Sequence, residues 1–243
     1  MTWTARPPIR SPFAPTPGAS AGAGGGDAPL RILTVCTGNI CRSAYAQHVL
    51  QARLDAALGP GAVEVSSAGR GPNQALSVPE EILGLVPEGP VREALAAHRP
   101  RMLTAQVLQG QHLVLAATDA HLEAVLREAP AVLHRCLTML DAGTLFSRDD
   151  AVTPGGGPRA LSTAIRQGRS TLRGTGTPGS TRGTADLPDP FRGPAAGYTA
   201  MAQALDPALE AVARAVERAM GPADPALGSG AAPGSGPAQP QRD

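Results

Sequence analysis

The stretch Val35-Cys36-Thr37-Gly38-Asn39-Ile40-Cys41-Arg42-Ser43 decides how this chain folds and what it can bind. The apolar run that precedes it, Ile32–Val35, predicts a strand, and a helical pattern begins near Ser43. The stretch is therefore a loop between the end of a strand and the start of a helix, where backbone N–H groups and the helix dipole attract anions. Gly38 and Asn39 tolerate left-handed backbone, so the loop can curl its amides inward around an anion.

The side chains of this loop suit the transfer of a phosphoryl group. A helix N-terminus and a nearby guanidinium favour the ionised, nucleophilic form of the Cys36 thiol. Arg42 presents a planar fork that can bind two phosphate oxygens, and the Ser43 hydroxyl can donate a hydrogen bond to the thiolate. We expect a phosphocysteine intermediate on Cys36. The expected phosphate-binding residues are Thr37, Gly38, Asn39, Ile40, Cys41 and Arg42.

A carboxyl group far downstream is the candidate general acid. Asp189 lies between Pro188 and Pro190, which restrict the backbone and help to aim the side chain. It would protonate the leaving oxygen in the first step and activate water in the second. Asp186 is a rival for this role, three residues earlier.

Composition restricts the remaining function classes. The chain has 243 residues and a net charge of +1, so no strong field directs it to nucleic acid or membrane. All of its 21 basic residues are Arg, which excludes a Walker-type nucleotide loop because that loop needs a Lys. Three Cys are too few for a disulfide framework, which favours a reducing compartment. The sequence also has no apolar signal segment and no run long enough to span a membrane, so we expect a cytoplasmic protein. No Cys/His spacing resembles a zinc site, so we expect neither metal nor cofactor.

Pro- and Gly-rich segments delimit the domain. We expect disordered tails at residues 1–29 and 221–243, and one domain at residues 30–220. A low-complexity insertion is expected at 154–185, flexible except for a possible short helix at Arg159–Arg173. This insertion carries five Arg and no acid, but without aromatics to stack on bases we expect no nucleic-acid binding.

Between the tails, apolar runs alternate with helical patterns. The predicted strands are Leu30–Val35, Val63–Ser66, Leu113–Ala116 and Cys136–Leu140. Helices are predicted from Ser43 to Leu58, from a Thr118 cap to before Pro130, and from Tyr198 to Met220. Pro207 predicts either a kink in the last helix or a new start capped by Asp206. This alternation predicts an α/β fold of three layers, a parallel sheet with helices on both faces and the binding site beyond the strand ends.

Cys36-Thr37-Gly38-Asn39-Ile40-Cys41-Arg42-Ser43, with Asp189-Pro190-Phe191 downstream, resembles the low-molecular-weight protein-tyrosine phosphatase family. Ser66-Ser67-Ala68-Gly69 and the pair His98 and Arg101 also resemble its pattern. The resemblance implies a four-stranded parallel sheet, Cys36 as nucleophile, Arg42 as phosphate ligand and Asp189 as acid. Ala44 replaces the usual Pro, and Arg70-Gly71-Pro72 stands where the family commonly has an aromatic residue in the substrate cleft.

The predicted function is a protein-tyrosine phosphatase that acts on phosphotyrosine in protein substrates. The alternatives are an arsenate reductase on the same scaffold, which would need further thiols near the loop, and a non-catalytic phosphate-binding module. Cys41 is either a redox partner of Cys36 or a small loop residue, and both interpretations remain open. Cys136 lies in an apolar strand and is expected to be an inert buried thiol. The five His are interpreted as surface or structural residues.

Overall fold

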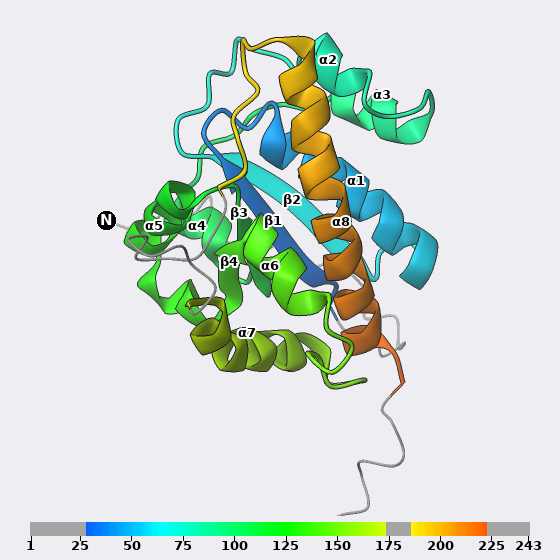
Figure 1. The fold of residues 1–243 in the computed structure, drawn as a ribbon, viewed down its shortest axis with the longest axis vertical. Coiled ribbons are helices and arrows are strands. Elements are labelled where there is room, and N and C mark those ends of the chain that lie inside the picture. The colour runs from blue at the N-terminus through cyan, green and yellow to red at the C-terminus, as the bar shows by residue number, and fades with distance from the viewer. Residues whose placement is uncertain (1–27, 174–185, 223–243) are drawn as a thin grey trace, which may run out of the picture.

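The computed structural model describes residues 28–173 and 186–222. Within these residues, four strands form one parallel sheet in the order β2-β1-β3-β4 (Figure 1). The strands are β1 Leu30–Cys36, β2 Val63–Gly69, β3 Leu113–Ala116 and β4 Cys136–Thr138. The predicted four-stranded parallel sheet is confirmed. Since β1 pairs with both β2 and β3, the loop that follows Cys36 emerges from the middle of the sheet edge.

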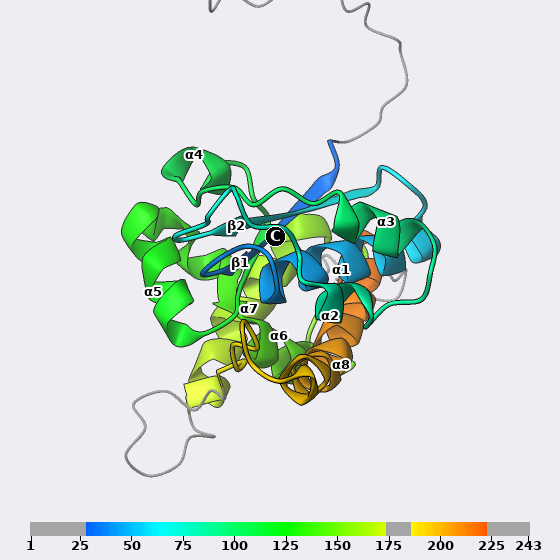
Figure 2. The ribbon, with the colours of Figure 1, turned by 90° about the horizontal axis from the view of Figure 1, so that it is seen from above.

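Helices cover both faces of the sheet, as the view from above shows (Figure 2). The larger core lies between the sheet and α1 (Arg42–Leu58), α6 (Met139–Phe146), α7 (Gly157–Arg173) and α8 (Ala195–Met220). The smaller core lies under α4 (Ala105–Leu108), α5 (Asp119–Glu128) and the 3₁₀ helix η1 (Pro130–Arg135). Two short helices, α2 (Glu80–Leu83) and α3 (Pro90–Ala96), follow β2.

Alternation along β1 explains why both faces are covered. Ile32 belongs to the larger core and Leu33 to the smaller one, and both are fully buried. Successive side chains of a strand point to opposite faces, so an uninterrupted apolar strand needs packing on each side. The predicted three-layer arrangement is thereby confirmed.

Two local predictions were wrong or incomplete. The strand predicted at Cys136–Leu140 ends at Thr138, whose side chain accepts a hydrogen bond from the amide of Asp141 and caps α6. A short apolar run does not by itself distinguish a strand from a buried helix. Of the two alternatives predicted at Pro207, a kink or a new helix start capped by Asp206, the new start is absent, because α8 continues through Pro207 in the described chain. Asp206 instead accepts a hydrogen bond from the hydroxyl of Tyr45 on α1 (3.0 Å).

The possible short helix predicted at Arg159–Arg173 inside the insertion is confirmed as α7, which has 17 residues and begins at Gly157. Leu161, Ile165 and Leu172 recur at helical spacing and are buried in the larger core. The expected linker at 174–185 lies outside the described residues, as do the expected tails apart from residues 28–29 and 221–222.

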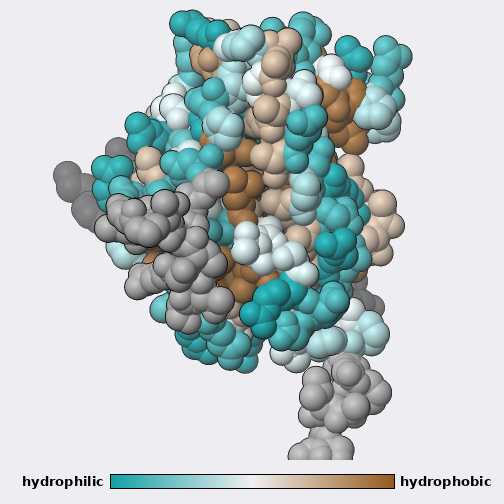
Figure 3. Space-filling model, viewed as in Figure 1, coloured by the Kyte–Doolittle hydropathy of each residue, from teal (hydrophilic) through white to brown (hydrophobic). Residues whose placement is uncertain are grey.

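The surface in Figure 3 shows how this packing divides polar from apolar residues. Apolar residues gather along the centre of the face shown, between α6 and α8, and hydrophilic residues surround them. Among the described helices, none has the length and apolar character needed to cross a membrane.

Candidate active site

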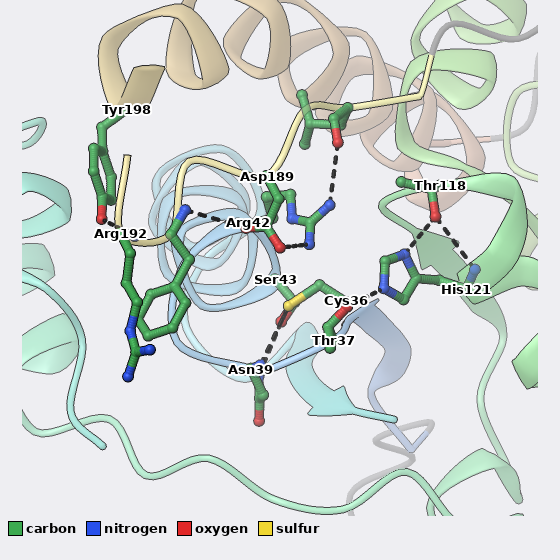
Figure 4. Close-up of polar contacts among 12 residues, drawn as sticks. Cys36, Thr37, Asn39, Arg42, Ser43, Thr118, His121, Asp189, Arg192 and Tyr198 are labelled. Carbon is green, nitrogen blue, oxygen red and sulfur yellow. Dashed lines mark hydrogen bonds and ion pairs between the residues drawn. The ribbon is translucent and has the colours of Figure 1, made fainter. Parts of the chain in front are cut away.

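Cys36 is the last residue of β1 and lies at the start of the loop that leads into α1. Its Sγ is 3.0 Å from the Ser43 hydroxyl and accepts a hydrogen bond from the Asn39 amide at 3.3 Å (Figure 4). Ser43 Oγ accepts from the side-chain amide of Asn39 at 3.0 Å, so its own proton is available for the sulfur. Two donors therefore converge on the sulfur and stabilise its negative charge.

Asn39 holds the loop in shape with every polar atom of its side chain. Its Nδ2 also donates to Ser67 Oγ (2.7 Å), and its Oδ1 accepts from the Arg101 amide (2.9 Å). The residue has a φ of 56°, so it adopts the left-handed backbone expected from its type. Gly38 also tolerates left-handed backbone, but its φ is not positive. The left-handed turn of the loop is therefore at Asn39.

The remaining loop amides are available for an anion. Among the described residues, no acceptor is paired with the amides of Gly38, Ile40 or Cys41. Cys41 is the N-cap of α1 and has no side-chain cap. Unpaired amides at a helix N-terminus can bind an anion, so the geometry is compatible with the role that the sequence predicts for this loop.

Close packing behind the loop requires glycine at position 69. A Cβ there would lie 2.5 Å from the carbonyl oxygen of Thr37 and 3.1 Å from Cβ of Asn39. Gly69 also pairs with Cys36 across β1 and β2, so it supports the loop from the neighbouring strand. Any larger residue would push the loop out of place.

Arg42 and Asp189 come together across 147 residues of sequence. The Arg42 guanidinium donates from NH2 to Asp189 Oδ2 at 2.6 Å and from NH1 to the carbonyl oxygen of Leu187 at 3.2 Å (Figure 4). Its side chain is 4% exposed, whereas that of Asp189 is 49% exposed. Arg42 Nε is buried and has no partner within the described residues. One donor of Arg42 is therefore left without an acceptor in the part of the chain that the structure describes.

The segment that carries Asp189 is anchored by Leu187. Leu187 is 1% exposed, and its amide donates to the carbonyl oxygen of Ala117, just after β3. Asp186 points elsewhere, because its Oδ1 accepts from the Asp119 amide at the start of α5 (2.9 Å). Of the two rival carboxylates, the structure brings Asp189 to the loop.

These groups share one cavity of about 160 Å³. The predicted residues that line it are Cys36, Thr37, Gly38, Ile40, Cys41, Arg42 and Asp189. Gly71, Asn73, Leu76 and Phe191 complete the wall. Asn39 and Ser43 lie behind the loop and hold it. In the part of the chain that is described, no group of three or more His, Cys, Asp or Glu has a metal-binding arrangement.

Two histidines contact the loop, and the sequence interpretation missed their position. His98 Nε2 is 2.9 Å from the carbonyl oxygen of Asn39, and His121 Nε2 is 2.8 Å from Thr37 Oγ1. Burial, together with the charges of Arg42 and Arg70, lowers the pKa of His121 to about 4. Burial also lowers the pKa of His98. Both are neutral at pH 7 and act as hydrogen-bonding supports.

The two other cysteines differ from Cys36. Burial, then the negative charge at Cys36, raises the pKa of Cys41 to about 12, so this thiol stays protonated. Cys136 is fully buried in the smaller core, on the opposite face of the sheet from Cys36. The arsenate reductase alternative needs a thiol relay near the loop, and the position of Cys136 does not provide one.

Comparisons with known proteins agree with this geometry. Residues 31–150 match the model of a family described as low molecular weight phosphotyrosine protein phosphatase. A low molecular weight protein-tyrosine-phosphatase, Etp of Escherichia coli, is 37% identical over 109 residues, which are 45% of this chain and 67% of that protein. A protein-arginine-phosphatase of Geobacillus stearothermophilus is 32% identical over 146 residues, which are 59% of this chain and 91% of that protein.

The fold is also shared with solved structures. The tyrosine phosphatase Wzb of Escherichia coli K30, in complex with phosphate, aligns with a TM-score of 0.52 at 21% identity. That alignment covers 78% of this chain and 93% of Wzb. The family model ends at residue 150, so it does not include Asp189, whose place beside Arg42 comes from the structure. Both relatives are more than 30% identical to this chain, and at least two thirds of each is matched. This chain therefore belongs to the low molecular weight phosphotyrosine protein phosphatase family, a family of phosphoric monoester hydrolases.

Proposed function

We propose that this protein hydrolyses phosphotyrosine in proteins through a phosphocysteine on Cys36, with Asp189 as general acid and then general base. The observation that carries the proposal is that one cavity is lined at once by the Cys36 thiol, the Arg42 guanidinium and the Asp189 carboxyl. A nucleophile, a cation for the phosphate oxygens and a proton donor are the groups that this reaction requires.

In the first step the thiolate of Cys36 attacks phosphorus in line with the leaving oxygen. The S–P bond forms, the P–O bond to tyrosine breaks, and Asp189 gives its proton to the departing phenolate. In the second step water attacks the phosphocysteine while Asp189 takes a proton from it, the S–P bond breaks and phosphate leaves. The donors from Asn39 and Ser43 stabilise the sulfur as a leaving thiolate.

Arg42 has to exchange partners when phosphate binds. Without a ligand, its NH2 group is paired with Asp189, and its buried Nε has no partner among the described residues. A phosphate oxygen can accept from Nε and draw NH2 away from the carboxylate. Asp189 is then released from its ion pair with Arg42 and is available to the leaving oxygen. In this proposal the ion pair is the resting state that the substrate opens.

The walls of the cavity favour an aromatic substrate group. Ile40, Leu76 and Phe191 present apolar surface beside the phosphate loop. One of the relatives is a protein-arginine-phosphatase, so phosphoarginine is the competing substrate class. A guanidinium group needs acceptors, and among the described lining side chains Asp189 is the one carboxylate.

The cellular context is part of the same proposal. We place the enzyme in the cytoplasm, with phosphotyrosine proteins as its partners, because all three cysteines are free thiols and the nucleophile requires a reducing environment.

The test compares phosphotyrosine and phosphoarginine peptides of matched sequence, together with p-nitrophenyl phosphate. We expect a higher kcat/KM for phosphotyrosine, and loss of at least about a thousandfold in kcat for Cys36→Ser and Arg42→Ala. Asp189→Asn should slow substrates with poor leaving groups more than p-nitrophenyl phosphate, because a good leaving group needs no proton. Asp186→Asn is the matched control. Preference for phosphoarginine, or a leaving-group effect in Asp186→Asn alone, would contradict the proposal.

A further inference from the structure

A groove adjoins the catalytic cavity, and the segment after β2 forms the wall between them. Gly71 lines the cavity, whereas Arg70, the residue before it, lines the groove. The amides of Arg70 and Gly71 donate to the carbonyl oxygens of Cys36 and Thr37, each at 3.1 Å. The wall is thus fixed to the catalytic loop. Consecutive Cα atoms are about 3.8 Å apart, so a substrate chain with its phosphorylated side chain in the cavity has the groove within reach of neighbouring residues.

The groove carries an excess of positive charge. Its lining consists of Arg70, Met102, Leu103, Ala124, Arg127 and Glu128, so two guanidinium groups face one carboxylate. Arg70 comes from the loop after β2 and Arg127 from α5, two segments that lie on the same side of the molecule (Figures 1 and 2). Both side chains are exposed, and neither forms an ion pair with a described residue.

Apolar side chains also line the groove. Met102 is 48% exposed, whereas Leu103 and Ala124 are buried. An extended chain with a Glu side chain can lay its methylenes on Met102 while its carboxylate reaches the cations. Two arginines on separate elements can also approach one carboxylate from two sides, which a single surface cation cannot do.

We propose that this groove is a subsite for an acidic side chain of the substrate protein, within about four residues of the phosphotyrosine. The subsite rests on the proposed phosphotyrosine phosphatase function and adds a substrate class to it. Arg70 and Arg127 select phosphotyrosine sites that are flanked by Asp or Glu. The acidic side chain belongs to the same substrate chain as the phosphotyrosine, because the groove and the cavity are lined by the consecutive residues Arg70 and Gly71.

The experiment measures kcat/KM of the full chain for phosphotyrosine peptides with Ala at all flanking positions, and for a series with one Glu at each position from −4 to +4. We expect a three- to tenfold preference for Glu at one or two neighbouring positions in low salt, falling as ionic strength rises. Arg70→Ala and Arg127→Ala should each reduce the ratio of Glu to Ala peptide, and Arg70→Glu should favour Lys at that position. Arg166→Ala, at an exposed position of α7, is the matched control.

The outcomes separate the subsite from the proposed reaction. Hydrolysis of p-nitrophenyl phosphate and of the all-Ala phosphotyrosine peptide, with equal rates for every Glu peptide, overturns the subsite and leaves the phosphatase function standing. A Glu preference that persists in the Arg70→Ala, Arg127→Ala double variant also overturns it. Failure of the wild type to hydrolyse any phosphotyrosine substrate overturns the proposed function itself. A Glu preference lost in the double variant and retained in Arg166→Ala supports the subsite.

Discussion

Replacing Asn39 by Ala tests whether one buried side chain holds the catalytic loop in place. The substitution removes the hydrogen bonds from Nδ2 to Ser43 Oγ (3.0 Å) and to Ser67 Oγ (2.7 Å), and the one that Oδ1 accepts from the Arg101 amide (2.9 Å). Three hydrogen bonds at about 1 kcal/mol each give a loss of about 3 kcal/mol. Alanine at a φ of 56° costs about 1 kcal/mol more. The expected total is about 4 kcal/mol, a large part of a typical domain's stability.

Urea unfolding followed by circular dichroism measures this loss, and hydrolysis of p-nitrophenyl phosphate measures its effect on the loop. Asn39→Gly removes the same hydrogen bonds but tolerates the left-handed backbone, so it should be more stable than Asn39→Ala by about 1 kcal/mol. Asn73→Ala is the control for stability, because the Asn73 side chain makes a single hydrogen bond in an exposed loop, to the Ala75 amide. A loss below about 1 kcal/mol in Asn39→Ala, with normal turnover, would refute the reasoning.

Three further predictions concern acid sensitivity, the glycine behind the loop and the packing of α7. Burial lowers the pKa of His98, and lowers those of His48 and His121 to about 4 from 6.5, so the unfolded chain binds more protons between these values. The free energy of unfolding should be highest above pH 6.5 and should fall towards pH 4, by up to about 1.4 kcal/mol per pH unit for each histidine. Urea midpoints that do not change from pH 7 to pH 5 would contradict this. Gly69→Ala should lower kcat at least about tenfold, because its Cβ would collide with the carbonyl oxygen of Thr37. Gly84→Ala is the control, because a Cβ there would make only ordinary contacts. Equal kcat values for the two variants would contradict the close packing at Gly69. Ile165→Ala in α7 should cost about 2–4 kcal/mol of unfolding free energy, and Arg166→Ala almost none. Equal stability of the two variants in urea unfolding would contradict the packing of α7 against the core.

The sequence was sufficient for the parts of the protein that local chemistry decides. Cys36, Arg42 and Ser43 lie seven residues apart or less, on a loop between an apolar strand and a helix, so their proximity follows from the chain itself. Alternating strand and helix patterns also predicted the parallel sheet, because parallel strands require such crossovers. Thr118 was correctly predicted to cap α5, since an N-cap depends on a hydrogen bond to a residue three positions away.

Short apolar segments and low-complexity composition were less informative. Met139 and Leu140 extend an apolar strand in the sequence, but the Thr138 cap turns them into the first residues of α6. Leu161 and Ile165 lie four residues apart, at helical spacing, in a segment rich in Arg, Ser, Gly and Thr. The helix α7 is stable because these apolar side chains pack into the larger core.

The sequence by itself determined the loop between β1 and α1, the residue types that suit it to phosphate, and the sheet from which it emerges. Only the tertiary structure decided that Asp189, and not Asp186, faces Arg42, because the buried Leu187 and its bond to Ala117 fix the rotation of that segment. It also placed His121 against Thr37 across 84 residues of sequence. Such contacts depend on how separate elements pack in three dimensions, and neither the spacing nor the type of these residues records that packing.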